Sequence, residues 1–160
     1  MRAYSLEIFA DYFQFYLFDE KSNPNFEEEW SPFAVNNLMA VTKEGIGIET
    51  VRNMVVPVHL ILHDAEPRLR EDVRSVFQIN EAEISIRSGK LVVMGCSDYL
   101  PEAKRIELPN GRYKIRVYYH GLDTVSEDGL DGDDSYGIEI WKTNKEQAPT
   151  FQKIKPLPKR

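Results

Sequence analysis

The sequence predicts a mainly β protein: a two-sheet antiparallel β-sandwich with one short helix near residues 32–42. Apolar and polar residues alternate in many short runs, which is the period of a strand. Turn residues separate these runs at spacings of roughly 8 to 12 residues, as in sandwiches. Only one segment carries the start and end signals of a helix, so an α/β fold is disfavoured.

The strand predictions follow the period of the apolar positions. Residues 4–8 alternate, and residues 12–18 are aromatic at nearly every position, which indicates a strand buried on both faces. The other predicted strands cover residues 46–51, 55–62, 73–79, 83–87, 90–95, 104–108, 112–119 and 135–142. Period-two placement predicts an interior formed by Phe13, Phe15, Leu17, Val58, Leu60, Val92, Ile115, Val117 and Ile138.

Two turns are predicted to close β-hairpins. Ser88 and Gly89 supply the two residues of a tight hairpin, and the turn at residues 109–111 contains Asn110 and Gly111, which tolerate positive φ.

The helix is predicted to start at Ser31, whose hydroxyl can cap the first turn. Pro32 suits the first helical position, and Gly45 follows the last apolar residue of the segment. The acidic run at residues 27–29 is interpreted as a solvated segment that precedes this helix.

Length and charge predict one domain over residues 1–142, followed by a basic, proline-containing tail over residues 143–160. We expect the tail to be disordered, with docking of Phe151, Ile154 and Leu157 along a sheet edge as the alternative. The net charge of −6 argues against direct nucleic-acid binding, because Lys and Arg supply most DNA affinity. No apolar run approaches the ~20 residues of a membrane helix, and neither a signal peptide nor a disulfide pattern is present, so a cytoplasmic location is expected.

No motif for catalysis, metal or cofactor binding is found. His59 and His63 are four residues apart, but in a strand this spacing separates them by about 13 Å, too far for one ion. Cys96 is expected to pack inertly, and no nucleophile elbow or phosphate loop is present. Trp30 and Trp141 are expected in the core.

The densest charge lies in the acidic loop, residues 123–134, which is predicted to be a surface loop. Its carboxylates are Asp123, Glu127, Asp128, Asp131, Asp133 and Asp134. Like charges at this density cannot be buried unpaired, so they face water, a cation or a basic partner. A helix–loop–helix calcium site is excluded, because counting from Asp131 puts Tyr136 at the glycine position. A solvated turn, an irregular calcium loop and a surface that steers a basic protein remain open.

Five segments of the chain carry a resemblance to a known family. They are residues 11–18 (DYFQFYLF), Trp30 before the short helix, residues 45–50 (GIGIET), residues 106–113 (IELPNGRY) and residues 134–138 (DSYGI). Together they resemble the competence protein J family of bacterial nuclease inhibitors, small proteins that bind and restrain a DNA-entry nuclease. The resemblance implies a non-enzymatic protein whose partner is a nuclease.

Two function hypotheses follow. The first is a nuclease inhibitor or immunity-type protein that occludes a basic nucleic-acid-binding surface, with Asp123, Glu127, Asp128, Asp131, Asp133, Asp134 and Tyr136 as partner-binding residues. Tight binding would also need an aromatic anchor, expected among Tyr99, Tyr118, Tyr119 and Tyr136. The alternative is a β-sandwich that binds a carbohydrate or another small ligand, with or without calcium.

Overall fold

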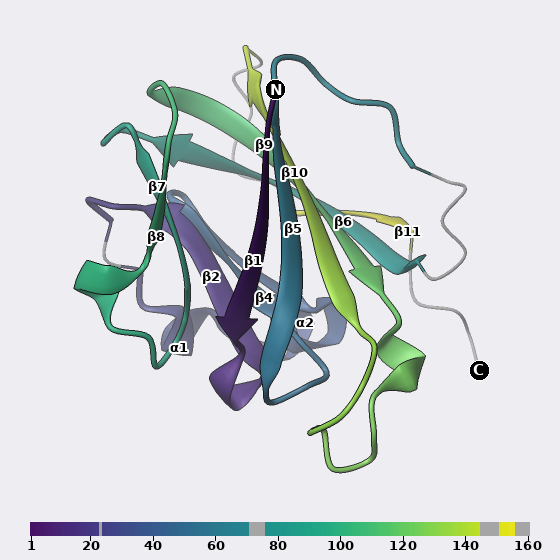
Figure 1. Ribbon diagram of the computed structural model, residues 1–160. Helices are drawn as coiled ribbons and strands as arrows, with labels where there is room; N and C mark the ends of the chain where they lie inside the picture. Colours follow the sequence, from purple (N-terminus) through teal and green to yellow (C-terminus); the bar gives the residue numbers. More distant parts are fainter. Residues whose placement is uncertain (23, 71–75, 145–150, 156–160) are drawn as a thin grey trace.

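The computed structural model describes residues 1–22, 24–70, 76–144 and 151–155, and two packed β-sheets form most of this structure (Figure 1). The six-stranded sheet consists, in spatial order, of β1 (Arg2–Phe9), β5 (Val55–His63), β10 (Ser135–Thr143), β9 (Gly111–His120), β6 (Val76–Ile86) and β11 (Gln152–Lys155). The five-stranded sheet consists of β3 (Met39–Thr42), β4 (Gly45–Glu49), β2 (Gln14–Asp19), β7 (Lys90–Gly95) and β8 (Lys104–Glu107). The predicted fold class is confirmed, with one difference: β10 pairs with β5 in parallel.

The core lies between the facing sheets, where alternate residues of each strand point inward. Eight of the nine predicted interior residues are buried, the exception being Phe13. The prediction for Phe13 was wrong because residues Asp11–Phe13 form a 3-10 turn, in which Tyr12 and Phe13 adopt positive φ, and the strand starts only at Gln14.

Both hairpin predictions were wrong, because each turn carries the chain from one sheet to the other. The β6–β9 ladder ends at the pair Ile86 and Gly111, and the β7–β8 ladder begins at the pair Lys90 and Glu107. The two-stranded ribbon thus folds over a corner and covers both sides of the core. The Leu108 N–H donates to the carbonyl oxygen of Gly89 across this corner, at 3.1 Å. A turn's composition indicates a reversal of direction but not which strands pair.

Two short helices flank the five-stranded sheet, α1 (Phe26–Glu29) and α2 (Pro32–Asn37). The predicted cap is confirmed, since the Ala34 N–H donates to Ser31 Oγ at 3.1 Å. The predicted end near residue 42 was wrong: Leu38 adopts a left-handed conformation with φ of 63° and ends α2, and β3 follows. The acidic run is itself part of α1. Among the described residues, none of the helices qualifies as a membrane-spanning segment.

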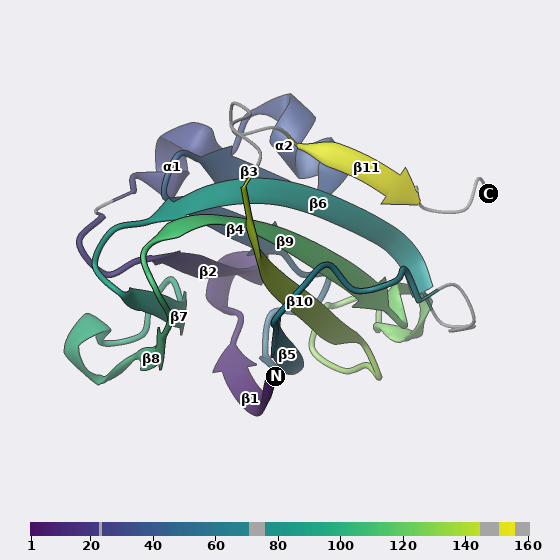
Figure 2. The same cartoon turned by 90° about the horizontal axis from the view of Figure 1, so that it is seen from above.

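The tail contributes one strand. β11 pairs with β6 and forms the edge of the six-stranded sheet, and Phe151 contacts Phe33 of α2 edge to face. Figure 2 shows β11, α1 and α2 on one side of the molecule. Residues 151–155 therefore dock along a sheet edge, which was the alternative expectation for the tail. Leu157, and residues 73–75 of a predicted strand, lie outside the described residues.

Candidate functional site

The acidic loop has a shape fixed by internal hydrogen bonds that centre on Ser126. The Ser126 N–H donates to the Asp131 carbonyl at 2.7 Å, and the Asp131 N–H donates to Ser126 Oγ at 3.0 Å. Asp128 accepts from the Ser126 hydroxyl at 2.6 Å and from the Leu130 N–H at 3.0 Å. These two hydrogen bonds lower the pKa of the Asp128 carboxyl. The loop therefore presents its charges in a defined arrangement.

The exposed carboxylates of this loop are Asp123, Glu127, Asp128, Asp131 and Asp133. None of them forms an ion pair with a Lys, Arg or His of the described residues. Their negative charge is thus presented to the surroundings, as the sequence led us to expect.

Asp134 and Tyr136 lie inside the protein, unlike the other residues predicted to bind a partner. The Asp134 carboxylate is fully buried, with Oδ1 at 2.8 Å from Arg52 Nε in an ion pair and Oδ2 accepting from the Tyr136 hydroxyl at 2.8 Å. Burial, followed by the charge of Asp134, raises the pKa of Tyr136 above its ordinary value. In this structure both residues anchor the acidic loop to the core rather than face a partner.

The predicted aromatic anchors are buried except for one. Tyr118, Tyr119 and Tyr136 are inaccessible, whereas Tyr99 is 68% exposed. Other large apolar side chains are exposed in or near the acidic loop. They are Phe9, Tyr12, Phe13, Met54, Val55 and Leu130.

Asn53 ties these apolar residues to the acidic loop. Its N–H donates to the Gly129 carbonyl at 2.7 Å, and its Oδ1 accepts from the Tyr12 N–H at 2.9 Å. Gly129 has φ of +75°, and a Cβ there would lie 2.9 Å from the Phe13 ring, so only glycine fits this approach. Figure 1 shows the β1–β2, β4–β5 and β9–β10 connections at one end of the sandwich, here called the loop end.

The backbone at the loop end is strained. Tyr12 and Phe13 have φ of 56° and 63°, a region in which bulky residues are rare. The side chain of Tyr12 is nevertheless 72% exposed. Strain of this kind persists where the surroundings hold it and gathers at functional sites. The sequence offered no signal for it, because the aromatic run has the composition of a buried strand.

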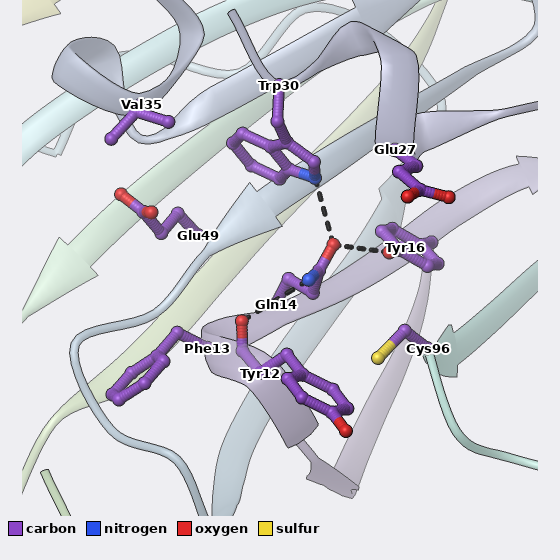
Figure 3. A pocket seen from close by; sticks show the side chains of 9 residues that line it. All are labelled: Tyr12, Phe13, Gln14, Tyr16, Glu27, Trp30, Val35, Glu49 and Cys96. Carbon is purple, nitrogen blue, oxygen red and sulfur yellow. Dashed lines mark hydrogen bonds between the residues drawn. The ribbon is translucent and has the colours of Figure 1, made fainter. Parts of the chain in front are cut away.

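An open cavity of about 360 Å³ adjoins Tyr12 and Phe13, and Figure 3 shows its lining. Gln14 organises it: Oε1 accepts from Trp30 Nε1 at 2.9 Å and from the Tyr16 hydroxyl, while Nε2 donates to the Tyr12 carbonyl at 3.3 Å. Trp30 therefore lines a surface cavity instead of lying in the core. We call this feature the aromatic cavity.

Glu49 is the chemically unusual residue of the aromatic cavity. It lies opposite Gln14 in the β2–β4 ladder and is half-buried. Burial raises the pKa of its carboxyl to about 7. No hydrogen bond or ion pair links this carboxylate to another residue in the described part of the chain.

The remaining candidates have ordinary partners. The ring of His63 lies 2.9 Å from Glu139, and the ring of His59 lies 3.4 Å from the Ser5 hydroxyl. The half-buried Cys96 donates its thiol to the Asp11 carbonyl at 3.3 Å, and burial raises its pKa. Within the described ranges, no three His, Cys, Asp or Glu side chains are grouped to hold a metal ion.

Comparison with known proteins shows which solved structures share this fold. No protein-family model and no curated protein sequence matches the chain. Among solved structures, the chain is similar to ComJ from Bacillus subtilis, an inhibitor of the DNA-degrading activity of NucA, with a TM-score of 0.65 and 19% identity over 89% of this chain and 98% of that one. It is also similar to a protein described as crocagin biosynthetic gene J, with a TM-score of 0.53 and 19% identity over 89% of this chain and 99% of that one. The chain therefore has the ComJ fold, as its sequence motifs indicated.

Proposed function

We propose that this protein is a non-enzymatic inhibitor of a DNA-degrading nuclease and that it acts from the cytoplasm. The observation that carries the proposal is the match to ComJ, which covers nearly the whole of both chains. The match shows a shared fold, and fold alone does not determine function. The surface features of this chain supply the second support.

The loop end has the composition of a surface that binds a basic protein. Five unpaired carboxylates of the acidic loop lie beside the exposed apolar side chains around Tyr12 and Phe13. Exposed charges steer a partner of opposite charge and raise the association rate, while desolvated aromatic residues supply most of the affinity. A nuclease holds DNA with Lys and Arg, so such a surface would occlude its substrate site.

The test is capture followed by inhibition. Immobilised protein is incubated with an extract of its own cells, and the retained fraction is eluted and assayed for DNA degradation before and after free protein is added. We expect a basic nuclease to be retained and its activity to fall to background at equimolar protein. Failure to retain any nuclease, together with DNA degradation that continues at a large excess of protein, would refute the proposal.

A matched pair of variants tests the surface. One carries Asp123→Asn, Glu127→Gln, Asp131→Asn and Asp133→Asn; the control carries Glu7→Gln, Glu66→Gln, Glu102→Gln and Glu107→Gln, which change the net charge equally at exposed positions outside the acidic loop. Only the first variant should inhibit more weakly. A melting temperature that rises with calcium or a sugar, without nuclease binding, would favour the small-ligand alternative instead.

A further inference from the structure

The charged groups that the aromatic cavity offers to a ligand are carboxylates. The Trp30 indole N–H and the Tyr16 hydroxyl both donate to Gln14, and the Cys96 thiol donates to the Asp11 carbonyl. The polar groups left over in the lining are the second N–H of the Gln14 amide, the exposed Tyr12 hydroxyl and two carboxylates, one of them on Glu49. An anionic ligand would find repulsion here, whereas a cationic ligand would find acceptors.

The second carboxylate belongs to Glu27 of α1. Figure 3 shows the carboxylates of Glu27 and Glu49 on either side of the Trp30 ring. In the described part of the chain neither is paired with a cation, and no Lys, Arg or His is among the residues that line the cavity. The charge complementarity therefore points to a cation supplied from outside.

The aromatic rings define the kind of cation. Trp30 presents its ring to the cavity beside Tyr12, Phe13 and Tyr16, and one face of Tyr16 is already stacked on Phe26 at 4.4 Å between ring centroids. A guanidinium group is flat, stacks on an indole face and can make two parallel hydrogen bonds to one carboxylate. An ammonium group does neither, so Arg fits this lining better than Lys.

We propose that the aromatic cavity receives one arginine side chain of the protein partner, with the guanidinium stacked on Trp30 and paired with Glu49. This inference rests on the proposed function, because it names the chemical group of the partner that the loop end anchors. The acidic loop then steers the partner and the aromatic cavity holds it.

Ionisation of Glu49 gives the proposal a pH signature. The carboxyl is partly protonated near neutral pH, so arginine must bind with release of a proton, and its affinity rises from pH 6 to pH 8. The other titratable groups that face Glu49 are Glu27, Tyr16 and Cys96 in the cavity and Tyr119 behind β4. Burial raises the pKa of each of the last three, so they stay neutral over most of this range.

The experiment titrates N-acetyl-arginine amide into the full chain and follows the indole N–H signals by two-dimensional NMR. The chain has two tryptophans, and Trp141, buried on the other sheet, serves as the internal reference. We expect a saturable shift of the Trp30 signal alone. Binding at pH 8 should be at least tenfold weaker for the neutral isostere N-acetyl-citrulline amide, and binding of the arginine probe should be up to about tenfold weaker at pH 6 than at pH 8.

Variants complete the test. Glu49→Gln should weaken binding of the arginine probe at least tenfold, whereas Glu28→Gln, on the same short helix as Glu27, should leave it unchanged. Equal binding of the arginine and citrulline probes, no effect of Glu49→Gln, or no Trp30 shift up to about 0.1 M probe would each overturn the proposal. If the probe fails while nuclease inhibition holds, only the arginine inference falls. If the probe binds but no nuclease is inhibited, the proposed function falls.

Discussion

Two acidic regions of this protein differ in what faces their carboxylates. On the outer face of the six-stranded sheet, Glu81, Glu83 and Glu139 form an outer-face network in which each carboxylate has a cationic or histidine partner, namely Arg116 at 2.7 Å, Arg112 at 2.9 Å and His63 at 2.9 Å. At the loop end, five exposed carboxylates have none among the described residues. The number of acidic residues therefore does not distinguish the two regions; the lack of internal partners does, and this lack supports the partner surface proposed at the loop end.

The side chains of the outer-face network are buried although they point away from the core between the sheets. Arg116 lies under the segment before residue 71, where its guanidinium donates to the Pro67 carbonyl at 3.1 Å, and it stacks on Trp141 at 4.8 Å from the ring centroid. A buried charge is tolerated only when it is paired and hydrogen-bonded. Loss of one partner here should cost far more stability than loss of a charge in the acidic loop.

The largest expected effect is therefore that of Arg116→Met, which removes the buried guanidinium between Glu81 and Glu139 and leaves them only Lys114 at 3.6 Å and His63 at 2.9 Å. We expect the free energy of unfolding to fall by about 3–5 kcal/mol, as for other broken buried pairs. Urea denaturation followed by circular dichroism measures it. Arg105→Met removes a half-exposed pair with Glu20 and should cost no more than about 1 kcal/mol. Equal losses of unfolding free energy in the two variants would show that the buried ion pairs of Arg116 stabilise the protein no more than the partly exposed pair of Arg105.

Two adjacent aspartates give the sharpest version of the same comparison. Asp134→Asn removes the buried partner of Arg52 and should lower the free energy of unfolding by about 2–3 kcal/mol. Asp133→Asn removes an exposed charge and should change it by less than about 0.5 kcal/mol. Thermal unfolding of both variants side by side checks the difference. A stable Asp134→Asn variant would mean that Asp134 is not an anchor of the acidic loop.

The third prediction concerns rates. The loop variant with four neutralised carboxylates should associate with the nuclease more slowly than the parent at low salt, because exposed charges act over a Debye length of about 10 Å at 0.1 M salt. The difference should shrink as salt rises, and the control variant should behave like the parent. Stopped-flow association across a salt series measures this. Identical rates at every ionic strength would remove the acidic loop from the steering surface.

Sequence reasoning reached the fold because period and turn spacing are local properties. The burial of residues such as Leu60 and Val117 can be predicted from the alternation of apolar and polar residues along their strands. The corner between β6 and β7 was missed because Ser88 and Gly89 permit a tight turn whether or not the flanking strands pair. Asp19 of β2 helps to fix this corner, since its buried carboxylate accepts from the Arg87 N–H at 3.0 Å and from the Ser88 hydroxyl. Such long-range contacts have no signature in the spacing of residues.

Of the candidate site, only the exposed carboxylates were predicted from the sequence, because the density of like charges indicates surface exposure by itself. The exposed carboxylates of the acidic loop were named correctly as surface groups, but Asp134 has the same side chain and differs only through the distant Arg52. The aromatic cavity was missed entirely, because Gln14, Trp30 and Glu49 come from three separate segments. Each of them reads in isolation as an ordinary strand or pre-helix residue.

The last expected effect is the pH dependence of stability that Glu49 contributes. Burial raises the pKa of its carboxyl in the folded protein to about 7, from an ordinary value of 4.5 that the unfolded chain retains. Between these values the folded state binds more protons than the unfolded state, so its stability falls as pH rises through this window. Glu49→Gln removes the titrating group. The melting temperature of the variant relative to the parent should therefore be constant below about pH 4.5, rise towards pH 7 and level off above it. Glu28→Gln, at an exposed position, should show no such rise. A difference between Glu49→Gln and the parent that stays the same from pH 4 to pH 8 would mean that the Glu49 carboxyl titrates normally, and the pH signature expected for arginine binding would then be lost as well.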